Sequence, residues 1–316
     1  MRISCSIVIE WDNARWAELA RPRRMAQSLA AEIAALDPAR AAVAEILVVY
    51  DRREVPHELI EEATRALAAP RPQLIATDGL RYYELKNLGA RTATGEVVVF
   101  IDSDVVPEPA WLARLLEPFA DPRASVVCGS TYVELETWFS RAVNLWWFFA
   151  TRDPRSGLQK VERFWANNVA FRRAPFARNG FPQLPTFRGQ CLVLARQLAR
   201  RGVPILQRID ARVAHPPPKG GWHFVCQALT EGYDRVTLLA MHRLSPQESW
   251  RASWMRFVVS LRHARERVGK KRREVGVGAL GGAGALVVAL VYYGLTFAGE
   301  RIGVRWPWVI RRYFPI

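Results

Sequence analysis

Two carboxylates close the most apolar strand-like run of the chain. Residues 97–104 read VVVFIDSD, so Asp102 and Asp104 follow five apolar residues and stand two positions apart. Asp is common in turns because its side chain accepts hydrogen bonds from nearby backbone N–H groups, so the triplet alone carries little weight. Paired carboxylates are also suitable ligands for Mg²⁺ or Mn²⁺, and such a cation commonly bridges to phosphates. The surrounding elements decide between turn chemistry and a cation site.

Strand-like and helix-like segments alternate through the first 120 residues. Apolar runs predict strands at 3–10, 44–51, 72–78 and 95–104, and helical periodicity predicts helices at 15–36, 56–69, 82–94 and 109–120. This order predicts an α/β fold with a mostly parallel central sheet covered on both faces. Ligands of such sheets bind at the C-terminal ends of the strands, where Asp51, Asp78, Asp102 and Asp104 fall.

Common phosphate-binding motifs are missing from the places that they require. The first predicted strand ends in IEWDNARW, without the Gly-x-Gly-x-x-Gly of a dinucleotide-binding fold, and the chain has no P-loop. A cation that neutralises a diphosphate leaving group without a P-loop indicates transfer from a sugar nucleotide. A nucleotidyltransferase also uses paired acids and Mg²⁺, but no Gly-rich basic loop follows the first strand.

Charge and cysteine usage narrow the class of protein further. The net charge of +15 is concentrated in residues 250–316, where 13 Lys and Arg face 3 acids, so we expect no nucleic-acid partner for the rest of the chain. The four cysteines are widely spaced and show no zinc-ligand spacing, which predicts reduced, mostly buried thiols in a cytoplasmic environment. The short apolar run near residue 7 does not predict a signal peptide.

The C-terminal region carries a membrane signal. Residues 275–298 contain no charge over 24 positions, which is long enough to cross the hydrocarbon core, and the basic run KKRR precedes them. Seven bases before the span against four after it predict that the N-terminal part faces the cytoplasm. A re-entrant hairpin is an alternative to a span, because the helix could break at Gly281, Gly282 and Gly284. A buried core helix is a further alternative. Residues 250–273 predict a basic amphipathic helix, either on an anionic membrane surface or packed on the catalytic domain.

Several segments together resemble family 2 inverting glycosyltransferases, which have the GT-A fold. The similar segments are SIVIEWDNA, ILVVYD, LKNLGARTATGEVVVFIDSDVVPEPAWL, WANNVAFRRAPFARNGFP and ARVAHPPP. The resemblance covers roughly residues 3–240, and the order and spacing of the segments make it specific. The Gln-x-x-Arg-Trp motif of processive relatives is absent, so we expect a single transfer.

The resemblance implies roles for individual residues. Asp51 would bond the nucleotide base, with uracil favoured, and Lys86 would lie near the phosphates. Asp102 would contact ribose or the cation, Asp104 would ligate the cation, Mg²⁺ or Mn²⁺, and His215 in the loop after the last predicted strand would approach the cation or the diphosphate. The remaining residues that we expect near the nucleotide sugar are Glu10, Asn13 and Asn87.

One segment departs from the family pattern. Relatives place an acidic pair, which includes the general base, where this chain has Arg188, Gly189 and Gln190. Glutamine cannot accept a proton in that role. Three explanations remain. Asp210 or Glu162 could serve as the base, or an acidic acceptor such as a phosphate beside Arg188 could need no base. The chain could also be a non-catalytic relative that binds a nucleotide sugar or a partner.

These observations predict a membrane-associated glycosyltransferase at the cytoplasmic membrane, single-pass or re-entrant. It would move a sugar from a nucleotide-diphosphate donor, with UDP-sugars favoured, to a membrane-held acceptor such as a polyprenyl phosphate or glycolipid, with inversion. We expect a GT-A domain at 1–245, a juxtamembrane helix at 246–274, a transmembrane helix at 275–298 and a basic aromatic tail at 299–316. Within the GT-A domain, 1–122 would bind the donor and 123–245 the acceptor.

Overall fold

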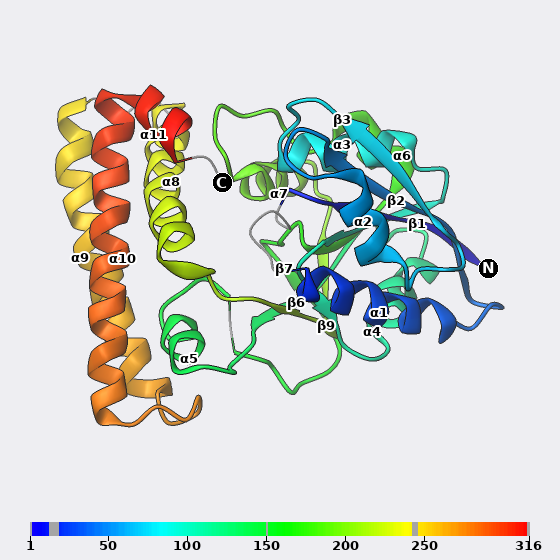
Figure 1. The fold of residues 1–316 in the computed structure, drawn as a ribbon, viewed down its shortest axis with the longest axis horizontal. Helices are drawn as coiled ribbons and strands as arrows, with labels where there is room; N and C mark the ends of the chain where they lie inside the picture. The colour runs from blue at the N-terminus through cyan, green and yellow to red at the C-terminus, as the bar shows by residue number, and fades with distance from the viewer. Residues whose placement is uncertain (1, 13–18, 150, 242–245, 315–316) are drawn as a thin grey trace. The chain divides into compact units, whose positions relative to one another are not determined.

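The computed structural model describes residues 2–12, 19–149, 151–241 and 246–314 (Figure 1). The chain forms two compact units. The first unit contains residues 1–132, 152–183 and 190–215. The second contains residues 133–151, 184–189 and 216–316.

A nine-stranded mixed sheet forms the centre of the first unit. Its strands are β1 (Ile3–Glu10), β2 (Ala41–Asp51), β3 (Pro72–Thr77), β4 (Val97–Asp102), β5 (Val106–Pro107), β6 (Val126–Val133), β7 (Leu158–Val161), β8 (Asn168–Arg172) and β9 (Ile205–His215). The order is β3-β2-β1-β4-β8-β6-β9-β5, and β7 pairs with β9. The strands β3, β2, β1 and β4 are parallel, whereas β8 is antiparallel to β4 and to β6. The parallel strands are rich in Val and Ile, which suit strands that are buried on both faces.

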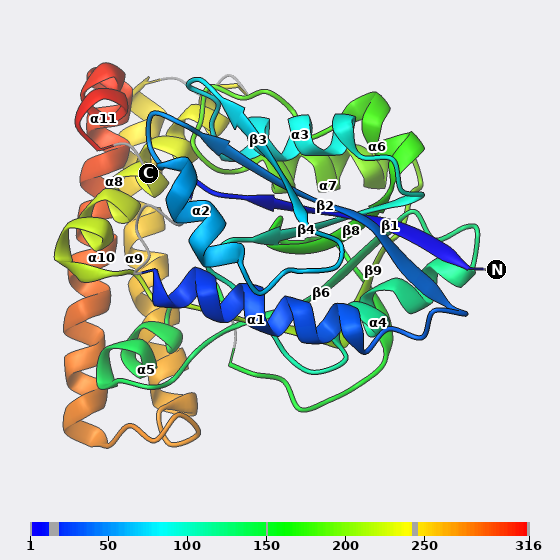
Figure 2. The ribbon, with the colours of Figure 1, turned by 45° about the vertical axis from the view of Figure 1, so that its right-hand side comes forward.

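Helices cover both faces of this sheet (Figure 2). They are α1 (Ala20–Ala34), α2 (His57–Thr64), α3 (Tyr82–Thr92), α4 (Trp111–Leu116), α6 (Arg173–Asn179) and α7 (Gln190–Arg200), with a short 3₁₀ turn at Glu117–Ala120. Successive strand side chains point to opposite faces. Val97, Val99 and Ile101 of β4 therefore pack with α1, α2 and α4, while Val98 and Phe100 pack with α3, α6 and α7.

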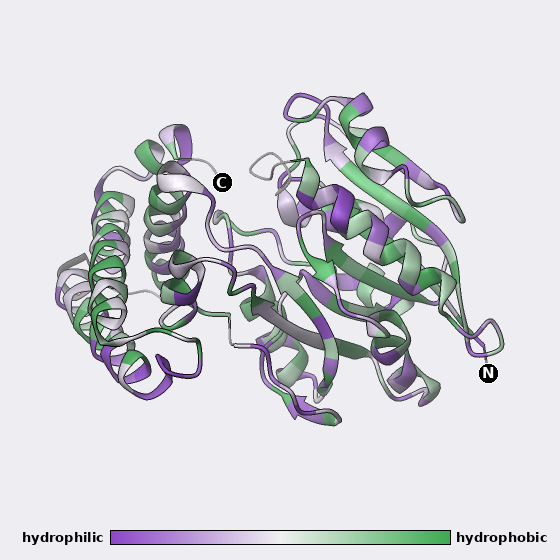
Figure 3. Cartoon of the chain, turned by 60° about the horizontal axis from the view of Figure 1, so that its bottom comes forward, coloured by the Kyte–Doolittle hydropathy of each residue, from purple (hydrophilic) through white to green (hydrophobic). Residues whose placement is uncertain are grey.

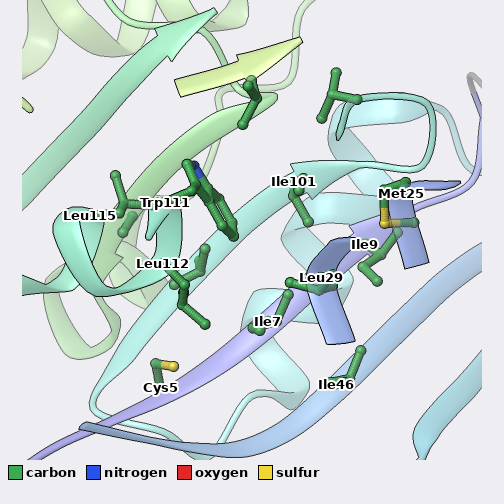
Figure 4. Packing of buried hydrophobic residues seen from close by; sticks show 14 of the residues in the cluster. Cys5, Ile7, Ile9, Met25, Leu29, Ile46, Ile101, Trp111, Leu112 and Leu115 are labelled. Carbon is green, nitrogen blue, oxygen red and sulfur yellow. The ribbon is translucent and has the colours of Figure 1, made fainter. Parts of the chain in front are cut away.

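Figure 4 shows the first of these two packed layers. Met25 and Leu29 of α1 and Trp111 of α4 meet Ile7 and Ile101 of the sheet, and all five are fully buried. Burial of each such side chain contributes roughly 1.5–3 kcal/mol. This packing therefore fixes the positions of the strands whose ends carry the candidate site. Figure 3 shows hydrophobic residues along the strands of the sheet.

The second unit is helical. It contains α5 (Trp138–Asn144), α8 (Gly220–Ala240), α9 (Pro246–Lys271), α10 (Ala279–Arg305) and α11 (Pro307–Tyr313). Two glycines let α8 and α10 approach closely. A Cβ at Gly232 would lie 2.0 Å from the Thr296 carbonyl oxygen, and one at Gly299 would lie 2.2 Å from that of Leu229. Any larger residue at either position would force the two helices apart.

The structure confirms the α/β class, with a parallel first half in a mixed sheet, and differs from the sequence expectations in detail. The expected helix at 109–120 is shorter and ends in the 3₁₀ turn. The apolar helix begins at Ala279 rather than at 275 and continues to Arg305. His215 is the last residue of β9 rather than part of a loop, because the strand pairing extends that far. The four cysteines are buried and form no disulfide, as expected.

Candidate functional site

The parallel strands end in acidic side chains at one edge of the sheet. Glu10 closes β1, Asp51 closes β2 and Asp102 closes β4, and the register places Glu10 directly opposite Asp102. Asp78 follows β3 and is paired with Arg52. The pairing with Arg52 lowers the pKa of the Asp78 carboxyl. The structure thus brings the predicted carboxylates to the same sheet edge, where ligands of such folds bind.

Asp102 lies in a buried hydrogen-bond network with α3. Lys86 Nζ donates to Asp102 Oδ1 at 2.7 Å, and the Lys86 side chain is fully buried. The Tyr82 hydroxyl lies 2.9 Å from both carboxylate oxygens of Asp102. The ammonium group also lies over the Tyr82 ring at 4.7 Å and the Phe100 ring at 5.7 Å. Buried charges persist only when they are paired in this way, so Lys86 and Tyr82 fix the position of the Asp102 carboxylate.

Two features of the sequence let α3 reach Asp102. Tyr82 and Lys86 are four residues apart, so they share one helix face. Gly89 continues that face one turn later, and a Cβ there would lie 2.4 Å from a methyl carbon of Val8 in β1. The absence of a side chain at Gly89 therefore allows α3 to pack close to the sheet. Glycine is required here for the close approach rather than for its backbone conformation.

Glu10 is a fully buried acid in this site. Its Oε2 accepts a hydrogen bond from the Asp12 backbone N–H at 2.8 Å. Burial raises the pKa of the Glu10 carboxyl well above its usual range, and the negative charge of Asp102 adds to the shift while Lys86 opposes it. Glu10 therefore favours a neutral carboxyl, which can donate as well as accept a hydrogen bond.

Asp104 differs from Asp102 in that one of its oxygens is not used. Oδ1 is buried and has no hydrogen-bond partner among the residues that the structure describes. The backbone of Asp104 is held firmly, because Arg21 of α1 donates to its carbonyl oxygen at 2.7 Å. Arg21 also donates to the Ala214 carbonyl of β9 at 2.7 Å. A buried carboxylate oxygen without a partner is costly unless a ligand or cation meets it, so Asp104 fits a cation ligand.

The pairing of β5 with β9 brings His215 toward this turn. Val106 pairs with Ala214 and Pro107 with Val213 in antiparallel register. Continuing that register places His215 opposite Val105, one residue from Asp104. Within the described residues, however, no group of three or more His, Cys, Asp or Glu side chains is arranged to hold a metal ion.

Two other predicted residues have their side chains engaged by the backbone, and a third cannot be placed. Asp51 accepts hydrogen bonds from the backbone N–H groups of Arg53 and Gly79, so it shapes the loops after β2 and β3. The Asn87 amide donates to the Phe181 carbonyl and accepts from its N–H, at 2.9 and 2.8 Å. Asn87 thus holds α3 to the segment after α6. Asn13 lies outside the described residues.

Gln190, the last residue of the stretch that departs from the family pattern, begins α7, and α7 lies next to the same network. Cys191 Sγ lies 3.4 Å from the hydroxyl of Tyr83, the residue after Tyr82. Burial raises the pKa of the Cys191 thiol to about 11, so this thiol is neutral near pH 7. Gln190 is buried beside it in sequence at the start of α7. The first residues of α7 therefore lie close to Asp102 and Lys86.

A carboxylate that sequence patterns did not indicate holds the segment before α7. Asp234 of α8 accepts hydrogen bonds from the backbone N–H groups of Phe187 and Arg188 at 2.8 and 2.7 Å. Burial raises the pKa of Asp234 to about 7, although the two backbone amides and Arg188 act in the opposite direction. Gly189 has a φ of +109°, and a Cβ there would lie 2.7 Å from Leu238. Asp234 thus supplies, from another helix, an acid next to the position where the family places its acidic pair.

The two candidate bases have different surroundings. Asp210 Oδ1 accepts from Arg208 at 2.8 Å, and Oδ2 lies 3.3 Å from Arg114. Burial would raise the pKa of Asp210, but its backbone hydrogen bonds and Arg208 outweigh this and lower it. Glu162 is exposed directly after β7. Asp210 therefore acts in a structural ion pair, whereas Glu162 is accessible to solvent.

An α/β unit of this topology, with carboxylates at the ends of its parallel strands, has the GT-A type of fold. Residues 37–180, somewhat less than half of the chain, match the glycosyl transferase family 2 model. This segment of the chain is therefore similar to the domain of glycosyl transferase family 2.

Individual relatives agree with this family. A glucosyl-dolichyl phosphate glucuronosyltransferase of Haloferax volcanii is 28% identical over 109 residues, which are 32% of this chain and 34% of the relative. The chain thus matches about a third of the length of that protein. The mannosyltransferase PcManGT of Pyrobaculum calidifontis, solved with GDP-Man and Mn²⁺, has a TM-score of 0.60 at 16% identity and covers 97% of this chain and 88% of its own. GalNAc-T7, solved with UDP, GalNAc and Mn²⁺, has a TM-score of 0.53 at 16% identity over 68% of this chain and 44% of its own. At such identities the two structures show a shared fold.

Proposed function

We propose that this protein transfers a sugar from a nucleotide-diphosphate donor to a phosphate-bearing lipid acceptor, with inversion at the anomeric carbon and one transfer per acceptor. The observation that carries the proposal is the contrast between the two aspartates. Asp102 is neutralised by Lys86, while Asp104 keeps a buried oxygen without a partner among the described residues. The family match over residues 37–180 and the fold it shares with donor-bound transferases support this assignment.

Each residue of the donor site has a separate task in this proposal. Asp104 would hold Mg²⁺ or Mn²⁺, and His215 would approach the same region from the end of β9. Such a cation neutralises the developing charge of a diphosphate leaving group. Asp102, oriented by its hydrogen bonds to Lys86 and Tyr82, would accept hydrogen bonds from the ribose. Glu10 and the loop shaped by Asp51 lie at the sheet edge where the base would bind. UDP-sugars and GDP-sugars are both donors to test, because the solved neighbours contain UDP or GDP-Man.

A phosphate acceptor also accounts for the missing acidic pair. A phosphate oxygen is already ionised near pH 7 and can attack without a general base, unlike a sugar hydroxyl. Asp210 is held by two arginines, and neither Arg188 nor Gln190 is a base. The relative from Haloferax volcanii is named for glucosyl-dolichyl phosphate, which supports a lipid-linked acceptor here; the phosphate as the attacking group rests on the missing acidic pair alone.

The helical unit gives the proposed acceptor a membrane location. Among the described residues, α10 is the one helix long and apolar enough to cross a bilayer by length and composition, a weak signal by itself. Leu280, Val287, Leu290 and Val291 on α10 are exposed, as are Trp250 and Trp254 on α9. We propose that this surface contacts the cytoplasmic face of a membrane, with the basic residues of α9 facing anionic lipids.

Contacts between α9 and α10 favour a position at the interface over a span. Arg256 pairs with Glu300 at 2.7 Å, and Gly282 lies beside Val268 and Arg272, so the helices run antiparallel along their length. Arg262 and Arg265 are exposed on α9 between these contacts, level with the middle of α10. A charge at the bilayer centre costs at least about 2.5 kcal/mol. The charges of Arg262 and Arg265 therefore disfavour an α10 that is surrounded by the bilayer. They favour an antiparallel pair of helices, α9 and α10, that lies along the lipid headgroups.

A transfer assay tests the proposed function. The full chain in neutral detergent is incubated with radiolabelled UDP- or GDP-sugars, Mn²⁺ and a polyprenyl phosphate, and label is counted in the organic phase. We expect label transfer by the wild type and at least a hundredfold loss in Asp104→Asn, while Asp37→Asn, at the opposite edge of the sheet, stays within twofold.

Two results would count against the proposal. The protein could instead bind the donor but neither transfer the sugar to any acceptor nor slowly hydrolyse the donor. That result would support a non-catalytic relative, the second candidate, because the segment Arg188–Gly189–Gln190 lacks the acidic pair. Transfer that is equal in Asp104→Asn and the wild type would remove Asp104 from the site.

A further inference from the structure

The helical unit contains a pocket that the donor site does not use. Its volume is about 380 Å³, and it lies between the segment after α5 and the helices α8, α9 and α10. Trp146 and Trp147 line it from the segment after α5, Glu231 and Arg235 from α8, Arg267 from α9 and Tyr292 from α10. The pocket therefore combines aromatic walls with several charged groups.

Most of these charges are already neutralised within the unit. Glu231 pairs with Arg235 and accepts a hydrogen bond from the Tyr292 hydroxyl at 2.6 Å. Glu266, which also borders the pocket, pairs with Arg262 at 3.1 Å. The two acids of the pocket are thus satisfied by groups other than Arg267.

Arg267 is the cation that remains. Its guanidinium donates to the carbonyl oxygens of Trp147 and Asn144, at 2.8 and 3.1 Å, and it has no carboxylate partner among the described residues. Burial lowers the pKa of Arg267, which is the expected effect of desolvating a cation that lacks a counter-ion. A half-buried guanidinium of this kind is stabilised strongly by an anion, and its planar fork matches the oxygens of a phosphate.

A second donor in the pocket wall lacks an acceptor. The indole Nε1 of Trp146 is buried and has no hydrogen-bond partner in the part of the chain that the structure describes. Buried indole N–H groups usually find a partner, so its absence is itself unusual. The Trp146 ring packs against Tyr292 at 5.0 Å, and Trp147 packs against the half-exposed Phe148 at 4.4 Å. The walls beside these donors are therefore apolar.

We propose that this pocket binds the phosphate head of a lipid, with Arg267 as its counter-ion and the aromatic segment Trp146–Phe148 against the first part of the hydrocarbon tail. An anion alone would use Arg267 but not the aromatic walls, and a purely apolar ligand would leave the guanidinium unpaired. Two lipids share the required chemistry: a phospholipid of the bilayer, and the lipid phosphate acceptor. The second source rests on the proposed function.

Calorimetry on the full chain in neutral detergent tests the pocket. The titrants are farnesyl phosphate, dioctanoyl phosphatidic acid and inorganic phosphate. We expect at least one lipid phosphate to bind tenfold or more tightly than inorganic phosphate. Arg267→Gln should weaken that binding at least tenfold, whereas Arg265→Gln, an exposed arginine two residues earlier on α9, should stay within twofold. A preference of tenfold or more for farnesyl phosphate identifies a polyprenyl phosphate as the lipid that the pocket holds, and comparable affinities identify a membrane phospholipid.

Further variants separate the pocket from the fold and from the donor site. Trp146→Phe removes the Nε1–H donor while keeping an aromatic ring, and we expect it to weaken binding three- to tenfold even where Arg267→Gln fails to fold. Asp104→Asn should bind lipid phosphate like the wild type, so failure of the transferase proposal leaves this test intact. The pocket proposal is overturned if neither lipid phosphate binds, if inorganic phosphate binds as tightly, or if Trp146→Phe has no effect and the two arginine variants behave alike.

Discussion

The buried Lys86–Asp102 pair gives the sharpest prediction about the site. Lys86→Met keeps an unbranched side chain of similar length but removes its charge, so the buried Asp102 loses the ammonium group that donates to its Oδ1. At 2.7 Å and an effective dielectric constant of 20, the Coulomb attraction is about 6 kcal/mol, part of which offsets desolvation. Removing one partner of such a pair typically costs about 3–5 kcal/mol. We therefore expect Lys86→Met to lower the free energy of unfolding by that amount.

Urea denaturation of the full chain in neutral detergent measures this change. Lys160→Met, at an exposed position on β7, is the matched control and should change the free energy of unfolding by less than about 0.5 kcal/mol. Adding Asp102→Asn to Lys86→Met removes the buried negative charge that has lost its ammonium partner, so the double variant should be more stable than Lys86→Met alone. A loss below about 1 kcal/mol in Lys86→Met, or a double variant less stable than the single one, would refute the assignment of a buried ion pair.

Three further outcomes follow from other contacts of the structure. The pKa of Asp234 is about 7 in the folded chain and about 3.8 in the unfolded chain, so the free energy of unfolding should fall by up to about 4 kcal/mol as the pH rises from 4 to 7. Denaturation of Asp234→Asn at several pH values should not show this fall. Arg21→Met releases the carbonyl of Asp104 and should weaken nucleotide-diphosphate binding about tenfold by calorimetry; unchanged affinity would show that Arg21 does not position the turn. Gly89→Ala should cost about 1–3 kcal/mol in urea denaturation, whereas Gly269→Ala, with open space around it, should be neutral or stabilising. Equal effects of the two glycine substitutions would contradict the close packing of α3 on the sheet.

The parallel half of the fold could be predicted from sequence because each strand is a continuous apolar run. The first strand lies at Ile3–Glu10, as predicted, and the others differ by a few residues at their ends. The helix α8 was not predicted, because its Gly-Gly start after three prolines resembles a loop and its apolar residues do not fall on one narrow face. The extension of α10 past Ala298 depends on Arg256, which neutralises Glu300 from another helix. Such tertiary pairing leaves no local signal.

Those residues of the candidate site that directly follow an apolar strand could be predicted from the sequence. Asp102 and Asp104 are marked by the apolar run before them, and Lys86 by the resemblance to the family. Tyr82 is four residues before Lys86, so helical spacing could have indicated it. Arg21 and Asp234 could not have been found, because their hydrogen bonds join residues 83 and 46 or more positions apart, and an arginine or an aspartate in a helix is usually exposed.

Metal-dependent binding of a nucleotide diphosphate tests the central claim most directly. Calorimetry with UDP and GDP, with and without Mn²⁺, would compare the wild type with Asp104→Ala. We expect binding that requires Mn²⁺ in the wild type and weakens at least a hundredfold in the variant, because the buried Asp104 oxygen would then hold the cation against the diphosphate. Binding that is independent of the metal, or equal in the two proteins, would contradict the account and leave Asp104 as turn chemistry at the end of β4.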